Sequence, residues 1–353
     1  MVKKKITHVL KKVKKPDEAT ALQSAVQNAP RITNETVAEH REQVLKGARK
    51  YILPLQHSKH QVIKITSAIV VLAIIGFFTY ITLALYRFEQ TSTFLYRVTQ
   101  VIPFPVAKTG DRFVAYENYL FELRHYMHYY ENQQKLNFED ESGKQQLEAF
   151  KEQARQKVVD DALVAQLAEQ NNVSVSESEV NDQINLVRNQ NRLGENEKVF
   201  QDVLNDYWGW DVDDFRRSLQ QQLLARKLVA ALDTDTQTRA NAALAEVNAG
   251  GDFAELAKKY SDEESTKDNG GEYGMQIART NRDLTAQTVD ALFALQPGQT
   301  SGIINTGYTL EIVKNLETVG ERVRGAHIVF TFDDIATYLD PLKEQQKTMM
   351  YIR

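Results

Sequence analysis

Histidines at short spacing are the first candidates for chemistry in this sequence. Two pairs stand three residues apart, His57 with His60 and His125 with His128. On a helix each pair would share one face, where two imidazoles can ligate one metal ion. No third ligand stands near either pair, and the chain has no cysteine, which excludes thiolate zinc sites and disulfides. We interpret both pairs as surface or packing residues, and we expect no metal and no other cofactor.

One segment has the length and composition of a membrane-spanning helix. Residues 65–86 carry no charge and lie between Lys64 and Arg87. At about 1.5 Å per residue such a helix reaches roughly 33 Å, enough to cross a hydrocarbon core of about 30 Å. A buried core helix would show a polar stripe, and a cleaved signal peptide would be shorter and nearer the N-terminus. We predict a single transmembrane anchor.

Charge is distributed unevenly around this segment. Residues 1–64 carry 14 Lys and Arg against 5 Asp and Glu, whereas the rest of the chain carries 29 basic and 42 acidic residues. Because Lys and Arg accumulate on the cytosolic flank of a span, we predict a plasma (inner) membrane protein with a cytosolic N-terminus and an extracytoplasmic bulk.

A lysine-rich run near the N-terminus has no interleaved aromatic residues, which favours anionic lipid over nucleic acid as its partner. The run contains Lys3, Lys4, Lys5, Lys11, Lys12, Lys14 and Lys15. We expect a basic tail and a juxtamembrane helix over residues 1–64, the latter at residues 35–52, and we expect no binding of nucleic acid.

Two folded regions follow the predicted anchor. From Glu117 to about Leu232 there is no proline, and glycine occurs only at 143, 194 and 209, so we expect helices, one over 144–172 and another from Ser176 or Ser178. We therefore predict an all-helical domain over 88–235. In residues 236–353, an Asp252 cap, a helix stopped by Pro297-Gly298 and alternating strands predict an α+β unit with a small antiparallel sheet. The fold class is α+β.

Several blocks of sequence resemble a known family. LVAQLAEQNNVSVSESEVNDQI and FQDVLNDYWGWDVDDFRRSLQQQLLARKLV are similar to the N-terminal chaperone domain of the SurA, PrsA and PpiD families. GGDFAELAKKYSDE, NGGEYG, DALFALQPGQTSGII and GYTLEIV, within residues 238–316, resemble a parvulin, the prolyl-isomerase domain of the same families. The resemblance implies a membrane-anchored, extracytoplasmic folding chaperone whose partners are unfolded or nascent secreted polypeptides. Exposed aromatic residues of the helical domain are the predicted client surface, unless they pack the domain instead: Tyr119, Tyr126, Tyr129, Tyr130, Trp208 and Trp210.

The chain departs from the parvulin pattern at its opening strand. A parvulin begins with a strand that carries a histidine, but here the matching segment VRGAHIVFTFDD stands at residues 323–334, with His327 at the histidine position. This segment either begins a truncated second repeat or completes the domain as a circular permutation. We favour permutation, because a hairpin through residues 317–320 would pair Ala326–Phe332 with Tyr308–Leu316 and fill the empty central place in the sheet. We then expect a helix from Ile335 to Arg353 over the same domain.

The resemblance also implies where the isomerase pocket stands, and several of its residues have changed. The pocket positions fall on His327, Glu263, Leu284, Thr288 and Thr309, with Phe293 as a nearby aromatic residue. Threonine replaces the family's phenylalanine at 288 and its second histidine at 309. We expect weak or no isomerase activity, with an active prolyl isomerase or a structural single-pass subunit of an envelope complex as the alternatives.

Overall fold

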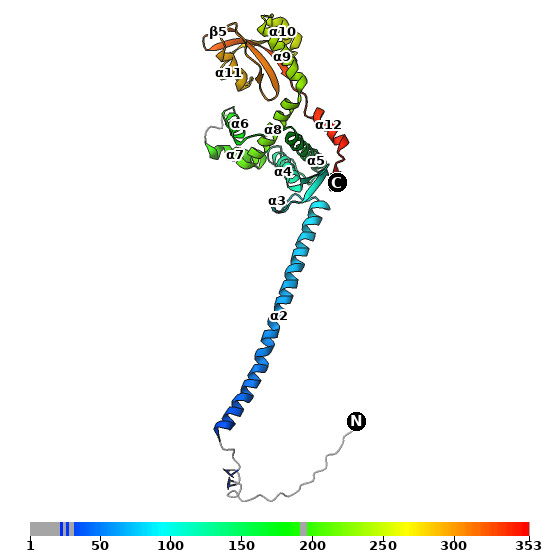
Figure 1. Ribbon diagram of the computed structural model, residues 1–353, viewed down its shortest axis with the longest axis vertical. Coiled ribbons are helices and arrows are strands. Elements are labelled where there is room, and N and C mark those ends of the chain that lie inside the picture. The colour runs from blue at the N-terminus through cyan, green and yellow to red at the C-terminus, as the bar shows by residue number, and fades with distance from the viewer. Residues whose placement is uncertain (1–21, 24–25, 28–31, 191–195, 353) are drawn as a thin grey trace. The chain divides into compact units, whose positions relative to one another are not determined.

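The computed structural model describes residues 22–23, 26–27, 32–190 and 196–352, without the side chains of residues 52–59 and 189–190 (Figure 1). The predicted lysine-rich run lies outside the described residues. Contacts divide the chain into two compact units, residues 1–80 and 81–353. Each unit is described by itself.

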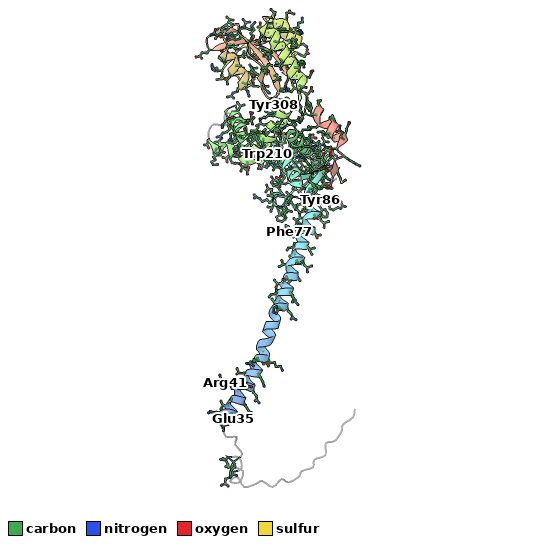
Figure 2. All side chains as sticks on the ribbon, in the orientation of Figure 1. Glu35, Arg41, Phe77, Tyr86, Trp210 and Tyr308 are labelled. Carbon is green, nitrogen blue, oxygen red and sulfur yellow. The ribbon has the colours of Figure 1, made fainter. Side chains whose placement is uncertain are left out.

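Helix α2 (Asn34–Tyr86) joins the predicted juxtamembrane helix and the predicted span into one element. Its apolar part is exposed over residues 65–80, with Ile65 at 59%, Leu72 at 67% and Ile75 at 56%. The side chains project from the helix on every side (Figure 2). Residues His60–Tyr86 are long and apolar enough to cross a membrane.

The last turn of α2 is part of the second unit. Ile81, Ala84 and Leu85 are at most 2% exposed and belong to its largest apolar core. The hydroxyl of Tyr86 donates a hydrogen bond to the carbonyl of Pro105 at 2.6 Å. The end of the apolar helix is thereby fixed inside a folded domain.

Six helices follow among the described residues in the first part of this unit. Helix α5 contacts α4 and α8 and buries Phe150, Ala154 and Val158 on the predicted face. Ser176 caps α6 as predicted, with its hydroxyl and the Glu179 carboxylate each accepting from the other residue's backbone N–H. The helices are α3 (Thr93–Val101), α4 (Tyr116–Asn132), α5 (Glu141–Gln170), α6 (Glu177–Gln190), α7 (Glu197–Trp208) and α8 (Val212–Leu232).

The prediction that residues 88–235 are all helical is wrong at one place. Strands β1 (Pro105–Thr109) and β2 (Arg112–Ala115) form an antiparallel hairpin. Gly110 lies in the turn at φ +55°, a conformation that glycine adopts at little cost. The strands on either side of the Gly110-Asp111 turn are five and four residues long, and β1 buries the adjacent residues Val106 and Ala107, so the hairpin shows no clear alternation in the sequence.

A four-stranded antiparallel sheet, in the order β3-β6-β5-β4, forms the second part of the unit. Helices α9 and α10 contact strands β5 and β6, and α11 also contacts both strands. The α+β fold class is confirmed. The elements are α9 (Thr234–Asn248), α10 (Phe253–Tyr260), the short η1 (Lys267–Asn269), β3 (Glu272–Ala278), α11 (Ala286–Ala294), β4 (Ile304–Asn305), β5 (Thr309–Val319) and β6 (Arg322–Thr331).

Strand β6 holds the centre of this sheet. It pairs with β5 from Thr309 opposite Thr331 to Val319 opposite Arg322, and it pairs with β3 on its other edge. The connection is two residues long and begins with Gly320 at φ +61°, as tight hairpins require. The predicted pairing of the two strands is confirmed, whereas the domain boundaries and the permutation stay predictions.

The expectation for the C-terminal residues is wrong. Helix α12 (Ala336–Gln345) ends early, and strand β7 (Met349–Met350) pairs with β1 of the helical part. Figure 1 shows α12 beside α5, and the Lys343 ammonium lies 2.8 Å from the Asp160 carboxylate. Leu339 and Ile352 are buried in the helical core. Burial of these apolar side chains stabilises residues 336–352 against the helical part and not against the four-stranded sheet.

Candidate functional site

The two faces of the four-stranded sheet differ in chemistry. Leu310, Ile312, Ile328 and Phe330 lie in the apolar core that also holds residues of α9 and α10. Because strand residues alternate between faces, Glu311 and His327 turn to the opposite face, which α11 covers. Polar groups are therefore concentrated on the α11 side of the sheet.

A buried carboxylate lies at the centre of this face. Glu311 is 9% exposed, and it accepts hydrogen bonds from the hydroxyls of Thr288, at 2.8 Å, and Thr309, at 3.0 Å. Thr288 comes from α11, where Thr285 caps the first turn. The two threonines at altered pocket positions are thus joined by a residue that the sequence analysis missed.

Two further hydroxyls complete the network around Glu311. Thr285 lies 2.8 Å from the Thr288 hydroxyl, and Thr306 lies 2.8 Å from the Thr309 hydroxyl. Each threonine that donates to Glu311 therefore has a second partner of its own. Four hydroxyls and one carboxylate occupy the place where the parvulin resemblance puts an aromatic ring and a histidine.

Three contacts fix the position of His327. Its imidazole Nε2 lies 3.0 Å from the Thr266 hydroxyl, and its ring centroid lies 4.2 Å from that of Tyr273. Its backbone N–H donates to the carbonyl of Gly271 at 2.8 Å. A Cβ on Gly271 would lie 2.1 Å from the His327 carbonyl oxygen, so the close approach of the turn between η1 and β3 to β6 requires glycine.

Burial controls the charge state of His327. The side chain is 8% exposed, and desolvation lowers its pKa to about 4, although the nearby charge of Glu263 acts in the opposite direction. At neutral pH the imidazole is uncharged. Its Nε2 can donate a hydrogen bond to the Thr266 hydroxyl or accept one from it, but the imidazole carries no positive charge.

We expect the parvulin-like sheet to lose stability as the pH falls from about 6.5 to about 4. In that window the unfolded chain binds a proton at His327 that the folded chain does not bind, so acid favours unfolding. The expected loss is on the order of 3 kcal/mol. Native-state hydrogen exchange of the β6 amides in the full chain measures it. His327→Gln should flatten the dependence, and an equally steep slope in that variant would contradict the assignment.

The other predicted pocket residues are dispersed around the network. Glu263 is half-buried, and its carboxylate accepts from the Ser265 hydroxyl at 2.5 Å. Leu284 and Phe293 pack at the edge of the α11 core. The Arg279 guanidinium lies 4.6 Å above the Phe293 ring. None of these three residues is joined to Glu311 by a hydrogen bond between described residues.

Tyr273 is a second residue that the sequence analysis missed. Burial raises the pKa of its hydroxyl, and the charge of Glu311 raises it further. The hydroxyl is buried without a hydrogen-bond partner among the described residues.

The alternation of β5 was the available signal for Glu311, because it places a charged residue between Leu310 and Ile312, both of which face the core.

The aromatic residues predicted to bind clients are packed to different extents. Tyr119 is 1% exposed, so the prediction that it forms an exposed surface is wrong: its ring packs edge-on against Tyr116, inside the core. The others are partly exposed, and contact with a client stays a prediction for Tyr126, Tyr129, Tyr130, Trp208 and Trp210.

The histidine pair in α4 faces the same aromatic group. His125 stacks on Trp210 with 4.3 Å between ring centroids, and burial lowers its pKa to about 4. Nε2 of His128 lies 3.1 Å from the carbonyl oxygen of Asp206. In the other pair, His60 is exposed and the side chain of His57 lies outside the described residues.

Comparison with protein families identifies both parts of the second unit. A SurA-like N-terminal domain matches residues 55–229, and a PPIC-type PPIase domain matches residues 224–317. The chain therefore contains a SurA-like N-terminal domain followed by a PPIC-type PPIase domain. The match to the parvulin domain ends before β6, so the strand that carries His327 lies outside it.

Three curated proteins match parts of the chain. Foldase protein PrsA of Caldanaerobacter subterraneus is 28% identical over 50% of the chain and 60% of its own length. Chaperone SurA of Albidiferax ferrireducens is 33% identical over 30% of the chain and 26% of its own length. The parvulin-like PPIase of Rickettsia typhi is 29% identical over 34% of the chain and 39% of its own length. The chain therefore spans about a quarter to three fifths of these relatives.

One solved structure is also similar. Foldase protein PrsA of Streptococcus pneumoniae is 21% identical, and the match covers 55% of this chain and 76% of that chain with a TM-score of 0.18.

Proposed function

We propose that this protein is a membrane-anchored, extracytoplasmic folding chaperone that binds unfolded or nascent polypeptides, and that its parvulin domain has weak or no prolyl isomerase activity. The SurA-like domain and the relatives named chaperone and foldase support the first half. The observation that carries the second half is the hydrogen-bonded network of Thr288, Glu311 and Thr309.

The network opposes isomerase activity for a physical reason. Prolyl isomerisation breaks no covalent bond, so an enzyme must lower an intrinsic barrier of about 18–20 kcal/mol by binding the twisted amide better than the planar one. A dry apolar wall around the proline ring supplies that preference. Here a carboxylate and hydroxyls line the corresponding place, and His327 is buried against Tyr273.

The chaperone function predicts that the full chain slows aggregation of an unfolded test protein at a stoichiometric ratio. The chain would be reconstituted in lipid nanodiscs, and light scattering would follow the test protein after dilution from denaturant. Empty nanodiscs are the control. Aggregation at the same rate with the chain and with empty nanodiscs would remove the main support for this function.

We propose that α2 anchors the protein with its N-terminus in the cytosol. Support comes from its exposed apolar surface and from the 14 basic against 5 acidic residues before the span. Protease added to spheroplasts should digest the chain beyond residue 88, detected through the loss of a C-terminal tag. Protection of that part until the membrane is dissolved would reverse the orientation.

We further propose that the parvulin domain is circularly permuted. The parvulin match ends at residue 317, and β6 supplies the histidine-bearing strand between β3 and β5 from the far end of the sequence. A truncated second repeat would instead begin a separate sheet. This proposal makes β6 indispensable to the domain.

A further inference from the structure

Exposed apolar side chains gather just after the end of α2. Phe88 is 65% exposed, Phe94 54%, Val101 82% and Phe113 64%. Single exposed residues are ordinary on a protein surface, but several in a short stretch are not. They lie on the loop after α2, on α3 and on strand β2.

Helix α3 carries two of these residues, Phe94 and Val101, in one exposed stripe. Phe94, Arg97 and Val101 are exposed at spacings of three and four residues, whereas Leu95 and Thr99 are buried on the other side. Apolar side chains exposed beside an arginine supply the two contributions by which a protein surface binds a membrane interface, apolar area and attraction to anionic lipid. Arg97 can extend its charged end toward the headgroups while its stem stays with the apolar residues.

The hairpin β1–β2 carries a further apolar surface. Pro103, Pro105 and Phe113 line an apolar hollow of about 410 Å³. The Lys108 ammonium lies 5.5 Å above the Phe113 ring. The hydrogen bond from Tyr86 to Pro105 ties this hollow to the last residue of α2.

The length of the apolar run gives an independent reason for membrane contact. Ile81 is the first residue of α2 that the second unit buries, so the charge-free part outside that unit covers residues 65–80. These sixteen residues reach about 24 Å, which is shorter than a hydrocarbon core of about 30 Å. Either the bilayer thins or the surface around residues 81–86 enters the interface.

We propose that α3 and the β1–β2 hairpin form a membrane-interface seat, in which Phe88, Phe94, Val101 and Phe113 insert among the lipid headgroups of the extracytoplasmic leaflet. The proposal rests on the proposed anchoring by α2. The occupant of this surface is the lipid bilayer itself. The seat would hold the helical domain against the membrane surface.

The absence of native cysteine allows a direct test in the full chain. Val101→Cys and Phe113→Cys, each carrying a nitroxide label, would be reconstituted in phosphatidylcholine–phosphatidylglycerol vesicles. Val199→Cys is the matched control, because Val199 is also an exposed helical valine, at 44%, but lies on α7. Collision of the label with lipid-soluble oxygen and with a water-soluble nickel chelate reports its depth.

We expect the oxygen-to-nickel collision ratio to be several-fold higher at residues 101 and 113 than at residue 199. Equal ratios in chains that float with the vesicles would overturn the seat and leave the anchor intact. Chains that fail to float would overturn the anchor and the seat together. Because all three side chains are exposed, the variants should keep the wild-type circular dichroism and thermal transition, which confirms that the label reports position in a folded chain.

Discussion

A chain that ends after Val319 should lose the cooperative unfolding of its parvulin domain. The truncation removes β6, which pairs with β3 and β5 at once and carries Ile328 and Phe330, both fully buried. Without it, the facing edges of β3 and β5 lose their partners and the apolar core opens. A stability of roughly 5–15 kcal/mol for a whole domain cannot absorb that loss. Hydrogen exchange of the β5 amides would show protection falling to the level of an unfolded chain.

A chain that ends after Asp334 is the matched control. It keeps β6 but lacks α12 and β7, whose contacts include the helical part. Protection of β5 should survive there, while the β1 amides, which lose their pairing with β7, should exchange faster. If the β5 amides were as strongly protected in the chain that ends after Val319 as in the chain that ends after Asp334, β6 would be dispensable and the permutation would be ruled out.

Removing one hydroxyl from the Glu311 network should cost more than removing the carboxylate. Thr288→Val leaves a buried carboxylate oxygen without its 2.8 Å donor, which should lower the free energy of unfolding by roughly 2–3 kcal/mol. Glu311→Leu leaves both threonines with the second partners they already have, Thr285 and Thr306, so its cost should be below about 1 kcal/mol.

The double variant makes this comparison decisive. Once Glu311 is leucine, Thr288→Val removes no partner from a buried charge, so the two changes together should cost less than the sum of each alone. Hydrogen exchange of the β5 amides in the full chain gives all three values. Simple additivity, or a Thr288→Val chain as stable as the wild type, would show that the hydrogen bond does not hold the carboxylate in place.

Local patterns predicted the elements that local chemistry determines. The helix around Phe150 has a regular apolar face, Ser176 and Asp252 accept from the first backbone N–H groups of their helices, and the β5–β6 hairpin has a short glycine turn. Each depends on neighbours within a few residues, where periodicity and capping are informative. The resemblance to parvulins then assigned β6 to its place in the sheet.

Features that depend on distant residues were missed. The destination of residues 336–352 depends on an open edge of β1, more than two hundred residues earlier in the chain. Tyr119 belongs to an aromatic-rich helix whose buried face depends on the packing of α4 against α5. Glu311 stood in the predicted strand, but its role as acceptor follows from the approach of α11 and of the loop that carries Thr306. Pattern alone does not specify such long-range contacts.

Refolding of an aggregation-prone protein whose slow phase is a prolyl isomerisation tests both halves of the proposed function in one measurement. The full chain in nanodiscs would be added at increasing ratios, and the yield of native protein and the rate constant of the slow phase would be read from the same traces. Our account predicts that the yield rises while the rate constant stays at its uncatalysed value. A rate constant that rises in proportion to the concentration of the chain, without an increase in the yield of native protein, would contradict this account.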